Sequence, residues 1–158
     1  MQTVLGLDPG SKNFGMFVGE VGKRFTVLQS GMLDTALTEL KGNIFEDIEE
    51  FAKDYCDLLR EFKPDVITIE RFQARGFKGK TVELVGVMLG IMVAHTARYC
   101  RKHECELRLL TASTWKNSVN RSSNLKAVYS VMKPRKVVDH RVDAALMSIY
   151  NVYGYEFL

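Results

Sequence analysis

The sequence predicts an α/β fold, with a five-stranded mixed sheet in the order βββαβαβα and helices on both faces. Buried strands are indicated by two short apolar or β-branched runs, Thr3–Leu7 and Asp65–Glu70. Each run ends at or beside an acid. Phe14–Glu20 and Arg24–Met32 flank a tight glycine-containing turn and predict an antiparallel meander. Helical periodicity then separates the later strands, as in sheets that helices cover.

The helices follow from apolar spacing and from residues that start and stop them. From Ile44 to Phe62 apolar residues recur at helical intervals, with Asn43 as a candidate cap and Lys63-Pro64 as the stop. A long apolar helix is expected from about Thr81 to Arg101. The remaining elements are expected to be a strand at Glu106–Leu110, a turn of helix around Ala112–Val119, a helix near Leu125–Met132 and a last helix from about Asp139 to Tyr153.

Length and composition favour one soluble domain. The 158 residues, 46% hydrophobic and 26% charged, suit a single domain over residues 1–158. The N-terminus lacks a basic region ahead of a long apolar run, so no signal peptide is expected. The apolar stretch Val82–Ala97 contains Glu83 and His95 and is too short and mixed to span a bilayer. A cytoplasmic protein without a membrane partner is expected, in a bacterium or a virus-infected cell.

The cysteines predict neither a disulfide framework nor a metal site. Cys56, Cys100 and Cys105 are odd in number and lack framework spacing. Cys100 and Cys105 with His103 could suggest zinc, but the spacing is unusual and no second ligand pair is present. Ordinary thiols are therefore expected.

Charge is distributed unevenly although the net charge is only +3. The segment Arg71–Lys80 holds four basic residues and no acid, and Trp115–Arg141 holds seven basic residues and one acid. The rest of the chain is correspondingly acidic. Two basic segments on an acidic body indicate a polyanion bound from one side, although loops with incidental basic residues would give the same composition.

Two strands end in a carboxylate that a flexible polar loop follows. Asp8 precedes the turn Pro9-Gly10-Ser11, and Glu70 closes the strand that begins at Asp65. If the two strands are parallel neighbours, both carboxylates emerge at the carboxyl edge of the sheet, where α/β proteins bind ligands. The alternatives are a turn-forming role for Asp8 and a simple ion pair of Glu70 with Arg71 or Arg75.

The last predicted helix opens with three further polar residues. Asp139 and Asp143 lie about 40° apart on the helix, and His140 and Asp143 about 60° apart, so each pair shares a face. Acids brought together from helix and strands would repel one another unless a cation lay between them. Oxygen ligands favour Mg²⁺ or Mn²⁺. Asp139 could equally be the helix N-cap.

With these residues in view, the chain resembles the RuvC-type Holliday-junction resolvases of the RNase H-like nuclease superfamily. The resemblance rests on three blocks in order, GLDPGSKNFG, DVITIERF and HRVDAAL. It implies an RNase H-like fold and a homodimeric, Mg²⁺-dependent endonuclease with two ions per site. Such an enzyme nicks opposing strands of a four-way DNA junction, leaving 5′-phosphate and 3′-hydroxyl ends.

The resemblance also assigns roles to residues. The family's four metal-binding positions fall on Asp8, Glu70, His140 and Asp143. The third is usually aspartate, and we favour His140 over the preceding Asp139 because its spacing matches the motif. Two lysines of the family's DNA-contacting region match catalytic candidates in this chain, Lys116 and Lys126.

DNA contacts are expected from the basic segments. In the family, the loop after Glu70 approaches the junction centre, where an aromatic ring can stack on a base. Phe77, flanked by glycines, is the better candidate for such a wedge, whereas Phe72 could be a core anchor. The stretch Asn117–Asn124 departs from the family's glycine-rich pattern, so cleavage preference is not inferred. The candidate DNA-binding residues are Phe72, Arg75, Phe77, Lys78, Lys80 and Arg121.

The apolar helix with Gly86 and Gly90 needs cover on more than one side, which a homodimer would supply. Three other functions stay open beside the resolvase. They are a nuclease for other branched DNA (flaps, Y-structures or forks), a junction-binding scaffold without activity, and an actin-like or sugar-kinase ATPase. The last needs two such domains, for which this chain is too short.

Overall fold

The computed structural model describes residues 1–10, 14–33, 44–72, 79–119, 124–134, 139–150 and 152. Within these residues the chain forms strands and helices in the predicted order. The strands are β1 (Gln2–Asp8), β2 (Phe14–Val21), β3 (Phe25–Leu33), β4 (Val66–Glu70) and β5 (Glu106–Leu110). The helices are α1 (Ile44–Phe62), α2 (Lys80–His103), α3 (Ala112–Val119), α4 (Asn124–Met132) and α5 (His140–Ile149).

The strands form one mixed sheet in the order β3-β2-β1-β4-β5. The first three strands are an antiparallel meander, and β4 and β5 run parallel to β1. The parallel strands need crossovers, which α1 and α2 provide on one face. Because β1 is central, its carboxyl end lies next to that of β4. The predicted α/β fold with a mixed sheet is thus confirmed.

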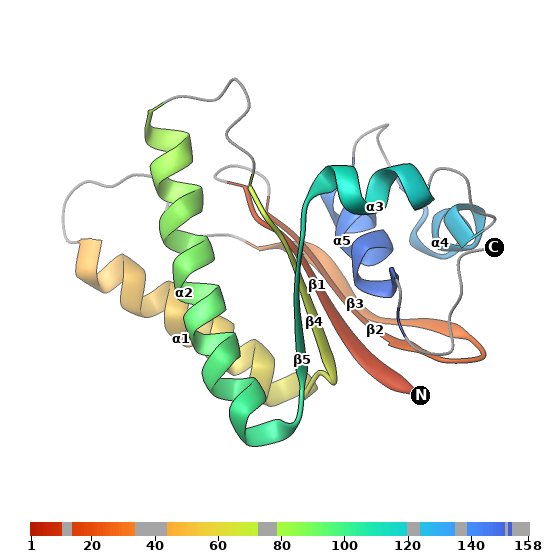
Figure 1. Ribbon diagram of the computed structural model, residues 1–158, viewed down its shortest axis with the longest axis horizontal. Helices are drawn as coiled ribbons and strands as arrows, with labels where there is room; N and C mark the ends of the chain where they lie inside the picture. The colour runs from red at the N-terminus through yellow and green to blue at the C-terminus, as the bar shows by residue number, and fades with distance from the viewer. Residues whose placement is uncertain are drawn as a thin grey trace.

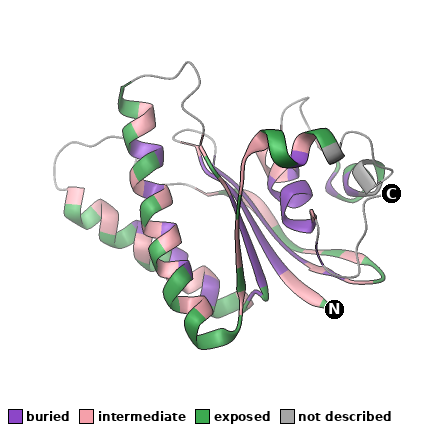
Figure 2. Ribbon diagram, in the orientation of Figure 1, coloured by how far each residue is buried: buried purple, intermediate pink, exposed green. Residues whose placement is uncertain are grey.

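The two faces of the sheet carry separate cores in a three-layer arrangement. Figure 1 shows α1 and α2 on one side of the sheet and α3, α4 and α5 on the other. Successive strand residues alternate between these faces, so Leu5 and Leu7 pack against α1 and α2, whereas Val4 packs against α5. Figure 2 shows the central strands as largely buried, and these are β1, β2 and β4, whereas the edge strands β3 and β5 are partly exposed. Both sides of β1 are therefore covered.

Helix α2 buries one stripe and exposes another. Leu84, Met88 and Met92 are buried against the sheet and α1, while Gly86 and Gly90 are exposed. The sequence predicted that Val82–Ala97 is too short and mixed to span a bilayer. By length and composition alone, however, the whole of α2 is long and apolar enough to cross a membrane, with 28% of the relevant window buried. Core helices of soluble proteins have the same composition when one face packs on a sheet.

The last helix is shorter than its apolar pattern indicated. The prediction ran to about Tyr153, but α5 ends at Ile149 because Tyr150 takes an extended conformation (φ −62°, ψ 122°). Val152 is nevertheless buried in the same core. The apolar pattern therefore continues beyond the end of the helix because the chain still packs on the core there.

The expectation of three thiols is also corrected. Cys100 and Cys105 form a disulfide, and Cys56 is free. The chain reverses between α2 and β5 at Glu104, whose backbone is left-handed (φ 51°), and this turn brings the two cysteine Cα atoms to 4.4 Å. The pairing depends on that reversal, which the cysteine spacing alone does not reveal.

Candidate active site

The two strand-end acids lie side by side on one face of the sheet. Leu7 pairs with Ile69 across the parallel strands β1 and β4, so the next position brings Asp8 beside Glu70. Both side chains point to the face that α5 covers. Gly6, two residues before Asp8, faces the same way, because a Cβ added to it would meet α5. Asp8 is buried, with 8% of the residue exposed. The sheet thus holds two carboxylates together at its carboxyl edge.

Helix α5 reaches these acids because glycines lie beneath it. A Cβ atom added at Gly15, the β2 partner of Asp8, would lie 2.1 Å from the carbonyl oxygen of His140. One added at Gly6 would lie 2.0 Å from that of Ala144. The helix backbone therefore rests directly on the sheet, and its first turn stands over Asp8. His140 Nδ1 lies 2.7 Å from Asp8 Oδ2.

Asp139 has a different role from the residue that follows it. It is the N-cap of α5, where its Oδ1 accepts from the backbone N–H of Arg141 at 3.1 Å. Its carboxylate also accepts from the Arg141 guanidinium at 2.9 and 2.6 Å. It is His140 that contacts Asp8, whereas Arg141 binds the Asp139 carboxylate. This geometry favours His140 as the fourth member of the site.

Helix α3 brings two donors to the acids. Lys116 Nζ lies 3.1 Å from Asp143 Oδ2, and the indole Nε1 of Trp115 donates to Glu70 Oε2 at 3.0 Å. The lysine ammonium also lies 5.0 Å from the Trp115 ring centroid. Sequence reasoning selected Lys116 but missed Trp115. The available signal was that a buried indole N–H needs an acceptor, and the neighbouring lysine was already placed at the acids.

The protonation equilibria show that these groups influence one another. Burial raises the pKa of Glu70, and the neighbouring Asp8 and Asp143 raise it further against the opposing effects of Lys116 and Trp115. The hydrogen bond to Asp8 raises the pKa of His140. Burial lowers the pKa of Lys116, but the attraction of Asp143, Glu70 and Asp8 outweighs it, and the net shift is upward. The site is therefore electrically coupled and rich in negative charge.

Comparison with known proteins gives a consistent result, although no protein-family model matches the chain. Crossover junction endodeoxyribonuclease RuvC of Prochlorococcus marinus is 30% identical over 98 residues, which are 61% of this chain and 60% of that protein. The chain thus matches less than two thirds of this relative's length.

Solved structures share the whole fold. Thermus thermophilus RuvC in complex with a Holliday junction substrate matches with a TM-score of 0.68 and 16% identity, over 94% of this chain and 90% of that one. A second structure of Thermus thermophilus RuvC matches with a TM-score of 0.65 and 16% identity, over 91% of this chain and 89% of that one. The yeast mitochondrial Holliday junction resolvase Ydc2 matches with a TM-score of 0.59 and 19% identity, over 91% of this chain and 75% of that one.

The chain is thus similar over part of its sequence to a RuvC, and it shares its fold with solved structures of RuvC and of Ydc2. Its sheet order and helix placement are those of the RuvC fold, so the RNase H-like architecture implied by the three sequence blocks is confirmed. The same three blocks carry the acids and the histidine of the site. They come together because β1, β4 and α5 are adjacent in this fold.

The donors at this site fit a hard divalent cation in chemistry, since they are carboxylate oxygens and one imidazole. As the side chains lie, however, no three His, Cys, Asp or Glu residues in the described part of the chain form a group that could hold a metal ion. Each acid is engaged by a neighbour: Asp8 by His140, Glu70 by Trp115 and Asp143 by Lys116. A metal centre at these residues would therefore require the donor atoms to converge more closely than they do in this structure.

The remaining candidate residues divide into those that the structure describes and those that lie outside the described residues. Phe72 is half-buried and packs on the core beneath α2, in agreement with the core-anchor alternative. Lys80 and Lys126 are exposed, at the start of α2 and on α4. Lys126 makes no ion pair within the described residues, so the structure does not bring it to the acids. Four predicted DNA-binding residues lie outside the described residues: Arg75, Phe77, Lys78 and Arg121.

Proposed function

We propose that the protein is a divalent-metal-dependent endonuclease that resolves four-way DNA junctions by paired cleavage, leaving 5′-phosphate and 3′-hydroxyl ends. The observation that carries the proposal is the gathering of Asp8, Glu70, His140 and Asp143 at one edge of a RuvC-type sheet. Burial, and then the neighbouring carboxylates of Asp8 and Asp143, raise the pKa of Glu70, and a bound cation would offset the repulsion among these acids.

The residues that would hold Mg²⁺ or Mn²⁺ are the same four. Two such ions held there would supply the chemistry of phosphodiester cleavage, namely activation of a water and stabilisation of the leaving oxygen. Asp8 is the central donor because it lies between Glu70 on the sheet and His140 on the helix. His140 can contribute a ring nitrogen or orient the attacking water. Glu70 and Asp143 would complete the oxygen donors.

Lys116 would neutralise the phosphate. Its raised pKa keeps it protonated at neutral pH, and its ammonium already lies against Asp143. A lysine so placed can transfer its contact from a carboxylate to a phosphate oxygen at the same edge. The two basic segments of the sequence would then guide DNA toward it.

A four-way junction is the preferred substrate because a RuvC of the same fold is found in complex with one. A nuclease for flaps, Y-structures or forks shares every feature of the site and is the second candidate. Paired cleavage requires two active sites, which a homodimer would supply. The exposed glycines of α2 are the surface on which we place that dimer.

The test uses a labelled junction with Mg²⁺ and the Asp8→Asn variant, which removes the central negative charge. Wild type is expected to nick opposing strands symmetrically, and Asp8→Asn to lose at least about 10²-fold in rate while binding the junction as tightly or more tightly. Asp57→Asn, an exposed acid of α1 paired with Arg60, is the matched control and should cleave normally.

Four outcomes separate the candidate functions. Similar rates on flap, Y, fork and junction at one salt concentration would favour the broader nuclease. Binding without cleavage in both Mg²⁺ and Mn²⁺ would leave the scaffold. Nucleotide hydrolysis would favour the ATPase. Equal loss of binding and cleavage in Asp8→Asn would contradict the assigned role of Asp8.

A further inference from the structure

Trp115 joins the protein core to the proposed active site. It is buried, with 1% of the residue exposed, and its indole Nε1 donates to Glu70 Oε2 at 3.0 Å. Glu70 is the last residue of β4, so a side chain that lies 45 residues away in the sequence fixes the orientation of a strand-end carboxylate.

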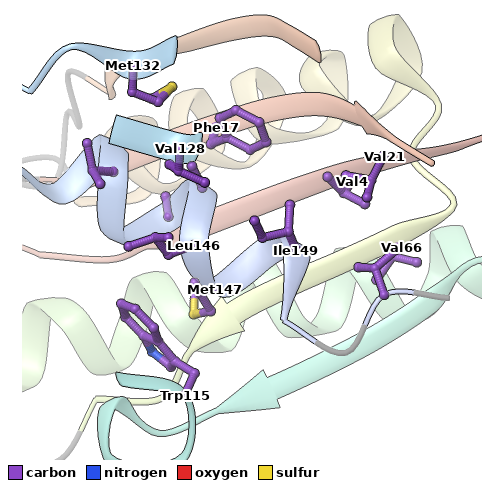
Figure 3. Packing of buried hydrophobic residues seen from close by; sticks show 14 residues of the cluster. Val4, Phe17, Val21, Val66, Trp115, Val128, Met132, Leu146, Met147 and Ile149 are labelled. Atoms are coloured by element: carbon purple, nitrogen blue, oxygen red, sulfur yellow. The ribbon is translucent and has the colours of Figure 1, made fainter. Parts of the chain in front are cut away.

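The indole itself is held from two directions. On one side it belongs to the core between α5 and the sheet, and Figure 3 shows it extending toward Met147 of α5. On the other side, α3 is anchored directly after β5, where Thr111 Oγ1 lies 2.8 Å from Thr114 Oγ1 and the Thr114 N–H donates to the Thr111 carbonyl at 2.9 Å. Trp115 therefore has little freedom to follow Glu70 if Glu70 moves.

The backbone of Glu70 is fixed as well. β4 pairs with β5 as far as Glu70 and Leu110, and the N–H of Arg71 donates to the Leu110 carbonyl at 2.7 Å. The remaining freedom of Glu70 is side-chain rotation. The indole engages one carboxylate oxygen, and a carboxylate can accept further bonds on both, so the contact orients Glu70 without using up its capacity as a ligand.

We infer that Trp115 is a positioning residue for Glu70: its buried indole N–H holds the carboxylate in the orientation from which it joins Asp8 at the sheet edge. The inference rests on the proposed function. The next residue, Lys116, binds Asp143, so one turn of α3 restrains two of the four proposed ligands. Donors of this kind that orient a ligand typically change metal affinity or activity by about 10–100-fold when removed.

A simpler explanation is that a buried indole takes the nearest acceptor and Glu70 happens to be that acceptor. Trp115 would then matter for stability alone. The two explanations differ in what Trp115→Phe does, because phenylalanine keeps an aromatic ring in the core and removes the donor. Phe17→Leu, at a buried position in the same core cluster, is the matched control for stability loss.

Trp115 is the protein's one tryptophan, which gives the first experiment a spectroscopic signature. The indole ¹H–¹⁵N correlation is a single resonance. We expect Glu70→Gln to shift it and Glu106→Gln, an exposed acid of β5 paired with Arg108, to leave it in place. Titration with Mg²⁺ should shift the wild-type resonance at the concentrations at which calorimetry detects binding.

The second experiment measures affinity and kinetics for Trp115→Phe. By calorimetry, the Kd for Mg²⁺ should rise by about 10–100-fold, and kcat on a labelled junction at fixed Mg²⁺ should fall while KM for the junction stays within about twofold, since a buried ring does not reach DNA. Phe17→Leu should match wild type in Mg²⁺ affinity and KM even where its stability falls equally.

Each result decides the inference. Unchanged Mg²⁺ affinity and kcat in Trp115→Phe, with wild type cleaving junctions, would overturn the positioning role and leave the nuclease standing. An indole resonance indifferent to Glu70→Gln would overturn it as well. If Mg²⁺ binding by the wild type shifts the indole resonance but the wild type does not cleave, the positioning role would be supported and the nuclease refuted. A wild type that neither binds Mg²⁺ nor cleaves would refute both.

Discussion

The ion pair between His140 and Asp8 makes stability depend on pH. The 2.7 Å contact raises the pKa of His140, so the folded chain binds this proton more tightly than the unfolded chain does. The stabilisation is therefore fully present below the unfolded pKa of about 6.5 and is lost as pH rises through the higher folded value.

The prediction concerns the difference in free energy of unfolding between wild type and His140→Gln. It should favour wild type at about pH 6 and shrink by about pH 9, as measured by urea denaturation. His103→Gln is the control, because His103 stacks on Tyr99 at the exposed end of α2. A difference that stays constant across this range would contradict the pairing.

Among the elements, α5 sets the geometry of the site through its contact with the sheet. Gly15 lies on β2 opposite Asp8, and the atom that crowds it is the backbone carbonyl of His140. Backbone cannot rotate away as a flexible side chain can. An added methyl group at Gly15 must therefore lift the first turn of α5 and move His140 and Asp143 with it.

Gly15→Ala is thus expected to lower the free energy of unfolding by about 1–3 kcal/mol and to reduce junction cleavage far more than its stability loss explains. Urea denaturation and cleavage assays on the same preparation check both effects. Gly31→Ala on β3 is the control, because nothing lies within 4 Å of the Cβ it adds. Normal cleavage by Gly15→Ala would refute the close-contact argument.

For the whole molecule, an exposed stripe of small residues on α2 offers a surface for a second copy of the chain. Gly86, Gly90 and Ala94 are exposed on it, and a Cβ added at either glycine meets nothing within 4 Å. The stripe begins at Glu83 and ends at Arg101, both exposed. Two copies packed antiparallel would place each Glu83 near the partner's Arg101, with small residues between them.

Gly90→Leu tests this arrangement. The monomer should gain up to about 1 kcal/mol, because leucine forms helix better than glycine, whereas the dimer should weaken because the helices can no longer approach closely. Sedimentation equilibrium and urea denaturation measure the two effects. Lys53→Leu, at an exposed site of α1, is the control and should leave association unchanged. A dimer that survives Gly90→Leu would place the interface elsewhere.

The sequence alone was sufficient for the strands and for most of the helices. Short apolar and β-branched runs mark β1 and β4, and the apolar spacing of α1, with a candidate cap before it and Lys63-Pro64 after it, gives both of its ends, Ile44 and Phe62. Both signals are local, because a buried face imposes its own spacing on each element. The end of α5 was not predictable in this way, since Val152 remains buried after the helix has stopped.

The sequence by itself also determined the chemical identity of the site: acids that close two strands, a histidine and an acid that open a helix, and a lysine nearby. Only the tertiary structure decided which partner each of them has. Asp139 is hydrogen-bonded to Arg141, His140 to Asp8, and Trp115 to Glu70. These contacts join residues on different elements, or choose between two neighbours on one helix. They depend on how closely α3 and α5 pack on the sheet, and no local pattern in the chain encodes that distance.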